Sequence, residues 1–238
     1  MKKNINGIIV LITFCSLCIN CFAMGTLNVS PPRLTIEAEQ KAGSVTITNA
    51  GNEPKLLQVS IKKWTQENNE DVLVDSKEVI VNPPAFTVEP GEQQIIRLGL
   101  RGSSPRHEEQ AYRMTIKEVP TATENSPKQS LNILMAMSLP VFFEPENPRA
   151  NANWELQQEG DKVKLSVTNT GNVHQRITKF EFFSKDVEEP FYSQGDNAYL
   201  FPNQTKEWTF TIDKASLSTP WSVVINANKG QVRKQLTD

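Results

Sequence analysis

The stretch Leu131–Phe143 reads Leu-Asn-Ile-Leu-Met-Ala-Met-Ser-Leu-Pro-Val-Phe-Phe and contains no charged residue. Alternate residues are apolar, which is the spacing of side chains on one face of a β-strand. The apolar row consists of Leu131, Ile133, Met135, Met137, Leu139 and Val141. Pro140 has no N–H to donate to a neighbouring strand, so it favours an edge strand or a bulge. Two interpretations stay open: a buried strand of a β-sandwich, or an edge kept apolar because another chain's strand or groove covers it.

The N-terminus predicts export from the cytoplasm. Lys2 and Lys3 precede an apolar run over residues 8–19, and Cys21-Phe22-Ala23 offers a small-x-small cleavage site, with cleavage after Ala23. The run is too short for a membrane anchor, so residues 1–23 are predicted to be a cleaved signal peptide. All three cysteines lie in this segment. The mature chain is therefore expected to be stabilised without disulfides and to have no cysteine nucleophile.

Charge and motifs argue against several classes of function. Signal removal leaves 23 basic residues against 27 acidic ones, a net charge of −4, which disfavours a nucleic-acid partner. His107 and His174 lack metal-ligand spacing, and His174 is expected to be a surface residue or one with satisfied hydrogen bonds. The pair Glu108-Glu109 is interpreted as solvated loop charge. Because catalytic and phosphate-binding motifs are also missing, we expect no enzyme, metal, cofactor or small-molecule substrate.

An internal repeat predicts two domains of one plan. Residues 44–52 read Ser-Val-Thr-Ile-Thr-Asn-Ala-Gly-Asn, and residues 164–172 read Lys-Leu-Ser-Val-Thr-Asn-Thr-Gly-Asn. Each copy is an alternating strand that runs into a turn and then a second strand. A second pair of blocks, Phe86–Leu98 and Tyr199–Phe210, follows in the same order, each with a Pro-Gly or Pro-Asn corner. The sequence therefore predicts an all-β chain of two tandem sandwiches of about 100 residues each.

The boundary between the two copies is marked by prolines. Glu144-Pro-Glu-Asn-Pro148 follows the apolar strand directly and disfavours continued strand pairing. The predicted division is residues 1–23 for the signal peptide, 24–145 for the first domain and 146–238 for the second. Because the apolar row ends at this hinge, its last residues are expected to line the cleft between the domains.

Four sequence blocks together resemble a known family. They are Val29–Ile36, the repeated Thr-Asn-x-Gly-Asn turn, Tyr112–Pro120, and Leu131–Pro145 with its Pro-Val-Phe-Phe-Glu-Pro ending. In this order they resemble the periplasmic (PapD-like) chaperones of the chaperone–usher pathway of pilus assembly, most closely the archaic, or alternate, subfamily. The resemblance spans the mature chain. It implies two immunoglobulin-like domains arranged as an L, a periplasmic location, and pilus subunits and an outer-membrane usher as partners.

The resemblance also implies a mechanism. The last strand of the first domain is lent to a subunit that lacks its own final strand, and apolar side chains of the donor fill the subunit's groove. By position, the donor residues are Leu131, Ile133, Met135 and Met137. Methionine suits this task because its unbranched thioether adapts to irregular pockets. When no subunit is bound, so apolar an edge is expected to drive self-association.

Members of this family hold the subunit's C-terminal carboxylate with two basic residues. One matches Arg33, whose guanidinium can bind a carboxylate through two parallel hydrogen bonds. The second is a lysine in the P-pilus type, and its position is Pro140 here. Arg113 is our candidate for the replacement, and Lys117 is the next. For both residues a solvated strand face is the competing interpretation.

Two other function classes are weighed against the chaperone. A secreted adhesin or pilus subunit would need an apolar N-terminal extension and one incomplete domain, whereas both repeats look complete. A carbohydrate-binding sandwich would need an exposed aromatic platform, for which four tryptophans are available: Trp64, Trp154, Trp208 and Trp221. Of these, Trp64 and Trp208 lie in strand patterns and are expected in the core.

Overall fold

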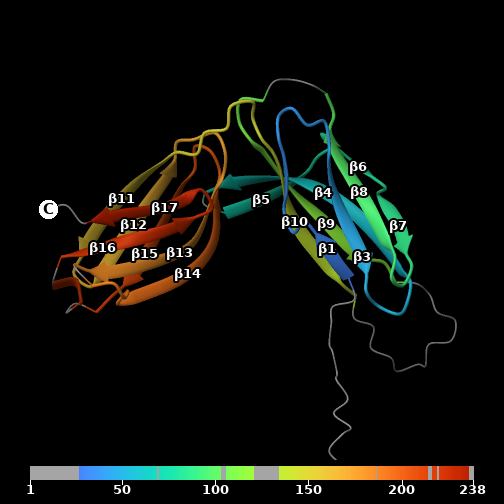
Figure 1. Cartoon of the computed structure of the whole chain (residues 1–238). Helices are drawn as coiled ribbons and strands as arrows, with labels where there is room; N and C mark the ends of the chain where they lie inside the picture. Colours follow the sequence, from blue (N-terminus) through green and yellow to red (C-terminus); the bar gives the residue numbers. More distant parts are fainter. Residues whose placement is uncertain are drawn as a thin grey trace, which may run out of the picture.

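The computed structural model describes residues 27–68, 70–102, 106–120, 134–185, 187–213, 216–218 and 220–235. Apart from one short 3₁₀ helix, all regular structure in this part of the chain is β-strand. Figure 1 shows two lobes that meet at an angle, the first built from β1–β10 and the second from β11–β17. Among the described residues, no helix has the length and apolar character needed to cross a membrane.

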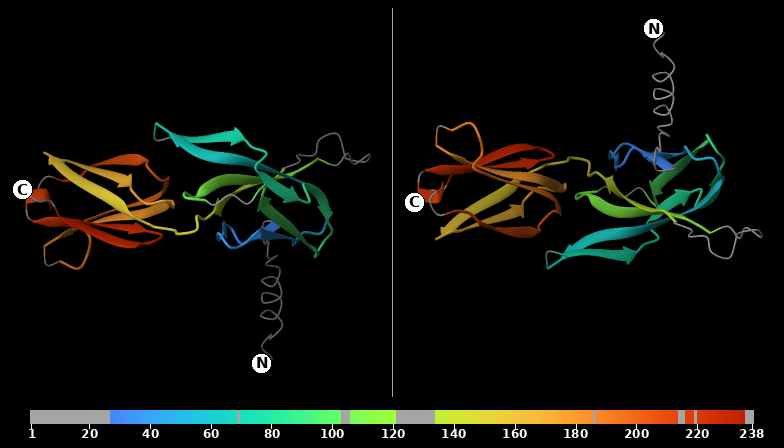
Figure 2. Two further views of the ribbon diagram at one scale, coloured as in Figure 1. Left: turned by 90° about the horizontal axis from the view of Figure 1, so that it is seen from above. Right: turned by 90° about the horizontal axis from the view of Figure 1, so that it is seen from below.

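The first domain is a sandwich of two sheets. One sheet has the strand order β1-β3-β8-β6, and the other has the order β2-β10-β9-β4-β5, with β7 also paired to β4. The strands are β1 (Leu27–Ser30), β2 (Leu34–Ile36), β3 (Gly43–Asn49), β4 (Lys55–Glu67), β5 (Glu70–Asp75), β6 (Val79–Asn82), β7 (Ala85–Val88), β8 (Gln93–Leu100), β9 (Gln110–Glu118) and β10 (Ala136–Phe143). The β4–β5 hairpin reaches toward the second domain (Figure 2).

The second domain repeats the sandwich with three strands against four. Its sheets have the orders β11-β12-β15 and β14-β13-β16-β17. The elements are β11 (Ala152–Glu159), β12 (Lys162–Asn169), β13 (Gln175–Ser184), β14 (Tyr192–Leu200), β15 (Thr205–Thr211), the 3₁₀ helix η1 (Ser216–Ser218), β16 (Trp221–Ala227) and β17 (Gly230–Gln235). The predicted all-β, two-domain fold is confirmed, and the proposed division after residue 145 falls in the connection between β10 and β11.

The repeated Thr-Asn-x-Gly-Asn sequence is explained by one buried asparagine in each domain. The side-chain amide of Asn49 donates to the carbonyls of Glu53 and Val88, at 2.8 and 2.9 Å, and its oxygen accepts from Gly51 N at 2.9 Å. Asn169 forms the equivalent three hydrogen bonds with Val173, Leu200 and Gly171, all at 2.9 Å. Both side chains are fully buried. An asparagine is needed here because the site requires two donors and one acceptor.

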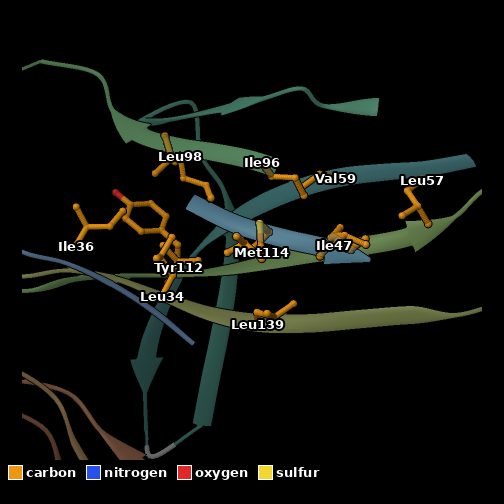
Figure 3. Packing of buried hydrophobic residues seen from close by; sticks show 14 of the residues in the cluster. Leu34, Ile36, Ile47, Leu57, Val59, Ile96, Leu98, Tyr112, Met114 and Leu139 are labelled. Carbon is orange, nitrogen blue, oxygen red and sulfur yellow. The ribbon is translucent and has the colours of Figure 1, made fainter. Parts of the chain in front are cut away.

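The core of the first domain lies between its two sheets (Figure 3). Alternate residues of each strand point into it, as the two-residue period of a strand requires. From the sheet that contains β10, the core receives Met114 of β9 and Leu139, Val141 and Phe143 of β10, all buried. The predicted alternation of the Leu131–Phe143 stretch is therefore correct over its described part. The expectation that the last residues of the row line the cleft between the domains is wrong, because Leu139 and Val141 lie in this core.

Candidate functional site

Strand β10 has a free edge over its first half. It pairs with β9 along its whole length, but its pairing with β2 covers only Val141–Phe143. Among the described residues, no strand pairs with the other edge of β10 from Ala136 to Pro140. The prediction that Pro140 belongs on an edge strand agrees with this arrangement.

The hydrogen bonds at the two ends of β10 show which of its backbone N–H and C=O groups face the free edge. Glu144 N donates to Ile36 O of β2 at 2.9 Å, whereas Met135 O accepts from Glu118 N on the β9 side, also at 2.9 Å. Because backbone groups alternate sides along a strand, the N–H and C=O groups of Ala136 and Ser138 point to the free edge. Pro140 points the same way and has no N–H. An incoming strand can therefore pair with β10 up to Pro140.

The predicted donor residues that the structure describes lie at the border of the core. Met135 and Met137 pack against the core cluster of the first domain, whereas Leu139 is 5 % exposed. Leu139 is therefore buried in the chaperone itself, whereas Met135 and Met137 are only partly buried. Two further predicted donors, Leu131 and Ile133, lie outside the described residues.

The other side of this sheet, which we call the cleft face, carries the positive charge. It is formed by the side chains that alternate with the core residues, and it turns toward the second domain. Its central members are Arg33, Lys62, Trp64, Ala111, Arg113, Pro140 and Phe142. Three of them, Trp64, Ala111 and Phe142, form a buried cluster with Tyr199 and Phe201 of the second domain.

Two predicted anchor residues flank Pro140 on the cleft face. Arg113 of β9 is paired directly with Pro140. Arg33 immediately precedes Leu34, which pairs with Val141, so it lies beside Pro140 on the opposite side. Neighbouring strands are about 4.8 Å apart, so the two arginine Cα atoms are separated by about 10 Å. Two long guanidinium side chains at this spacing can converge on one carboxylate.

A third cation, which the sequence analysis did not select, lies next to Arg113 on the cleft face. Lys62 of β4 is paired with Arg113 on the side away from Pro140. Its ammonium group forms an ion pair with Asp75 of β5 at 3.2 Å, and both side chains are largely exposed. The exposed ion pair contributes little to stability, and the lysine adds to the positive potential of the cleft face.

Arg113 does not lie on a freely solvated strand face. Its guanidinium carbon is 3.7 Å from the centroid of the Trp64 ring and 5.7 Å from that of Tyr199. Burial lowers the pKa of Arg113 from its ordinary value, and attraction to Tyr199 and Asp71 opposes this effect. Arginine stays charged under such conditions, so the site holds a half-buried cation over an aromatic ring.

Lys117 lies apart from the other two predicted anchors. It is exposed, and it is paired with Ala136 near the start of β10. Four residues of strand separate it from Arg113, a distance of about 13 Å. The structure therefore brings Arg33 and Arg113 together at Pro140 and leaves Lys117 toward the other end of the donor strand.

A buried polar pair joins the two domains, and it corrects one expectation. Glu109 was predicted to be solvated loop charge, but its side chain is 1 % exposed. Its Oε1 atom accepts hydrogen bonds from His174 N at 3.1 Å and lies 2.7 Å from His174 Nδ1. The imidazole stacks on Phe142 with 3.9 Å between ring centroids. His174 is thus a satisfied interior residue, as one of the two interpretations proposed.

Comparisons with known proteins agree with this geometry. Residues 26–149, just over half of the chain, match the family described as pili and flagellar-assembly chaperone, PapD N-terminal domain. The chain therefore belongs to this family of pilus-assembly chaperones. It is 21 % identical over 216 residues to the chaperone protein PapD of Escherichia coli, an alignment that covers 88 % of this chain and 85 % of PapD.

Solved structures show the same fold. The chain resembles a structure of the CsuC–CsuE chaperone–tip adhesion subunit complex from the archaic Csu pili of Acinetobacter baumannii, with a TM-score of 0.63 and 20 % identity over 89 % of this chain and 98 % of that one. The YadV chaperone gives the same TM-score at 16 % identity, over 89 % of this chain and 100 % of that one. The SafA pilin–SafB chaperone complex of Salmonella enterica gives 0.60 and 18 %, over 90 % and 97 %. The resemblance to PapD-like chaperones noted from the sequence is confirmed.

Proposed function

We propose that this chaperone captures pilus subunits in the periplasm by donor-strand complementation and passes them to an outer-membrane usher. The observation that carries the proposal is the free edge of β10. It combines backbone groups at Ala136 and Ser138 that pair with no described residue and an uncharged apolar row. An exposed apolar edge is ordinarily suppressed because it promotes aggregation. Because this chain belongs to a chaperone family, such an edge supports the interpretation that a bound client covers it.

The donor row supplies the apolar contacts in this proposal. Leu131, Ile133, Met135 and Met137 enter the groove of the subunit while the backbone of β10 completes its sheet. Where the row continues into Leu139, the side chain already belongs to the chaperone's own core. The lent segment therefore ends close to Pro140.

The cleft face fixes the register of the subunit. Its C-terminal carboxylate is held between Arg33 and Arg113, on either side of Pro140. The carboxylate then sits where the free edge of β10 ends, so the charge contact and the strand pairing select the same alignment. No chemical step is involved, and we propose no enzymatic activity and no cofactor.

The proposal is tested by co-expression with a pilus subunit that aggregates or is degraded alone. Ile133→Arg combined with Met135→Arg is expected to abolish the soluble 1:1 complex, because a charged side chain cannot enter an apolar groove without a large desolvation cost. Leu134→Arg is the matched control, since Leu134 is adjacent, 47 % exposed and on the opposite face. Normal complex yield with both donors replaced by arginine contradicts donor-strand capture.

The alternative functions are less well supported. A sugar-binding platform needs exposed aromatic rings, but Trp64 and Trp221 are buried at 2 and 5 % exposure. Trp154 and Trp208 are partly buried against the core of the second domain. Family membership likewise favours a chaperone over a pilus subunit.

A further inference from the structure

Trp64 occupies the centre of the contact between the domains. Its ring meets Tyr199 and Phe201 of the second domain edge-on, with centroid distances of 4.9 and 4.8 Å. On the first domain it lies 6.1 Å from the ring of Phe142, which belongs to the donor strand β10. Edge-to-face contacts from several directions leave the indole one orientation.

Two hydrogen bonds from a glutamine side chain hold the same part of β4 against the second domain. Gln66, two residues beyond Trp64, donates from its amide to Tyr199 O at 2.8 Å and accepts from Phe201 N at 3.0 Å. These two bonds attach β4 to the segment that supplies both aromatic neighbours of Trp64. The position of the indole is therefore set jointly by the two domains.

Arg113 lies against the indole face, at 3.7 Å between the guanidinium carbon and the ring centroid. A guanidinium that stacks on an aromatic ring keeps its edge N–H groups available in the plane of the stack. An arginine without such support has many rotamers and loses that freedom when it binds an anion. Stacking on a fixed ring removes this cost before the anion arrives.

We propose that Trp64 is a positioning residue for the carboxylate anchor, and that the second domain, through Tyr199 and Phe201, thereby takes part in selecting subunits by their C-terminus. This inference rests on the proposed function of Arg113. It assigns a role in client recognition to residues that need not touch the client. A subunit with a free C-terminal carboxylate is the ligand that this arrangement favours.

The test compares two forms of one pilin that co-purifies with the chaperone, prepared by protein ligation with a C-terminal carboxylate or a carboxamide. For each chaperone variant, the ratio of the two affinities measures the anchor alone. We expect the wild-type protein to favour the carboxylate by about tenfold or more, the range of a charge-assisted bidentate pair. Trp64→Leu is expected to bring the ratio to within about threefold of unity, and Trp64→Phe to retain most of the preference.

Further variants separate positioning from folding. Trp208→Leu is the matched control, because Trp208 also packs its indole against a core and has a cation, Lys206, over its ring at 5.9 Å. It should leave the ratio unchanged. Phe201 belongs to the second domain, and Phe201→Leu should also lower the ratio. This variant provides the same test if Trp64→Leu does not fold. The Nε–H resonance of Arg113 gives a signature without client: the indole ring current shifts it in the wild type, and Trp64→Leu removes the shift.

The outcomes distinguish this inference from the function on which it rests. If Trp64→Leu and Phe201→Leu weaken both pilin forms equally and keep the ratio, Trp64 is only structural and the inference fails, while the anchor stands. If Arg113→Ala keeps the wild-type ratio, Arg113 is not an anchor and both ideas fail at that residue.

Discussion

Shortening individual side chains of the donor row should separate binding from stability. Met135 and Met137 are partly buried against the chaperone's own core, whereas Leu139 is buried. Full burial of a methionine side chain contributes about 1.5–3 kcal/mol. Because most of that burial is already present in the free chaperone, about 0.5 kcal/mol per methionine is left for subunit capture. Met135→Ala and Met137→Ala are each expected to weaken capture about twofold, and together about fivefold.

Leu139→Ala should show the opposite profile. It removes a buried core side chain and should lower the free energy of unfolding of the chaperone by about 2–5 kcal/mol. Its folded fraction should capture subunits with unchanged affinity, because Leu139 has no burial left to gain. Chemical denaturation measures the first quantity.

The binding assay is a competition between differently tagged wild-type and variant chaperones for a limiting amount of refolding subunit. The ratio of the two complexes reports relative affinity and does not require the complex to dissociate. The reasoning is refuted if the two methionine variants compete equally with wild type, or if Leu139→Ala loses capture in proportion to its loss of stability. Either result would mean that the burial of a side chain in the free chaperone does not determine how much it contributes to the free energy of subunit binding.

Three further outcomes are expected. Arg33→Ala and Arg113→Ala should each weaken subunit binding, and neither loss should add to that caused by amidating the subunit's C-terminus, because all remove one shared interaction. The free chaperone should self-associate through its donor edge at high concentration in sedimentation experiments, and both Met137→Arg and added subunit should dissolve the dimer. Burial and a 2.6 Å hydrogen bond to Glu78 raise the pKa of Tyr112, so its phenol should stay protonated in alkaline spectrophotometric titration. Because the folded-state pKa is the higher one, this stabilisation is present below pH of about 10 and is lost as the pH rises further, a dependence that Tyr112→Phe should remove.

Local sequence patterns predicted the strands and the repeat well. The two-residue period of the Leu131–Phe143 stretch identified the face of β10 that meets the core, because that period follows from strand geometry alone. The repeated turn was informative for an equally local reason: Asn49 and Asn169 each bond to a glycine amide two residues away. Such contacts depend on a few consecutive residues, so they can be recognised in a sequence.

The contacts between the domains were not predictable in the same way. Glu109 was misjudged because its partner, His174, is 65 residues away and belongs to the other domain. A pair of adjacent carboxylates is ordinarily solvated, and only the relative placement of the domains shows that one of them is buried. The stacking of Arg113 on Trp64 was missed for a related reason. Alternation placed Trp64 in a core, but it could not show that this core lies between the domains.

Pro140 connects the two parts of the proposed site. It is the last residue of the free edge, its missing N–H faces the incoming strand, and the pairing with β2 begins at the next residue. In the proposed complex, a client strand cannot extend its ladder beyond this point, and its terminal carboxylate is expected to lie between Arg33 and Arg113. The family resemblance implies that in the P-pilus type a lysine at this position supplies the second charge. Under the same proposal, the proline here ends the ladder and Arg113, its partner on the neighbouring strand, supplies the charge. Register and anchoring are then divided between two neighbouring residues.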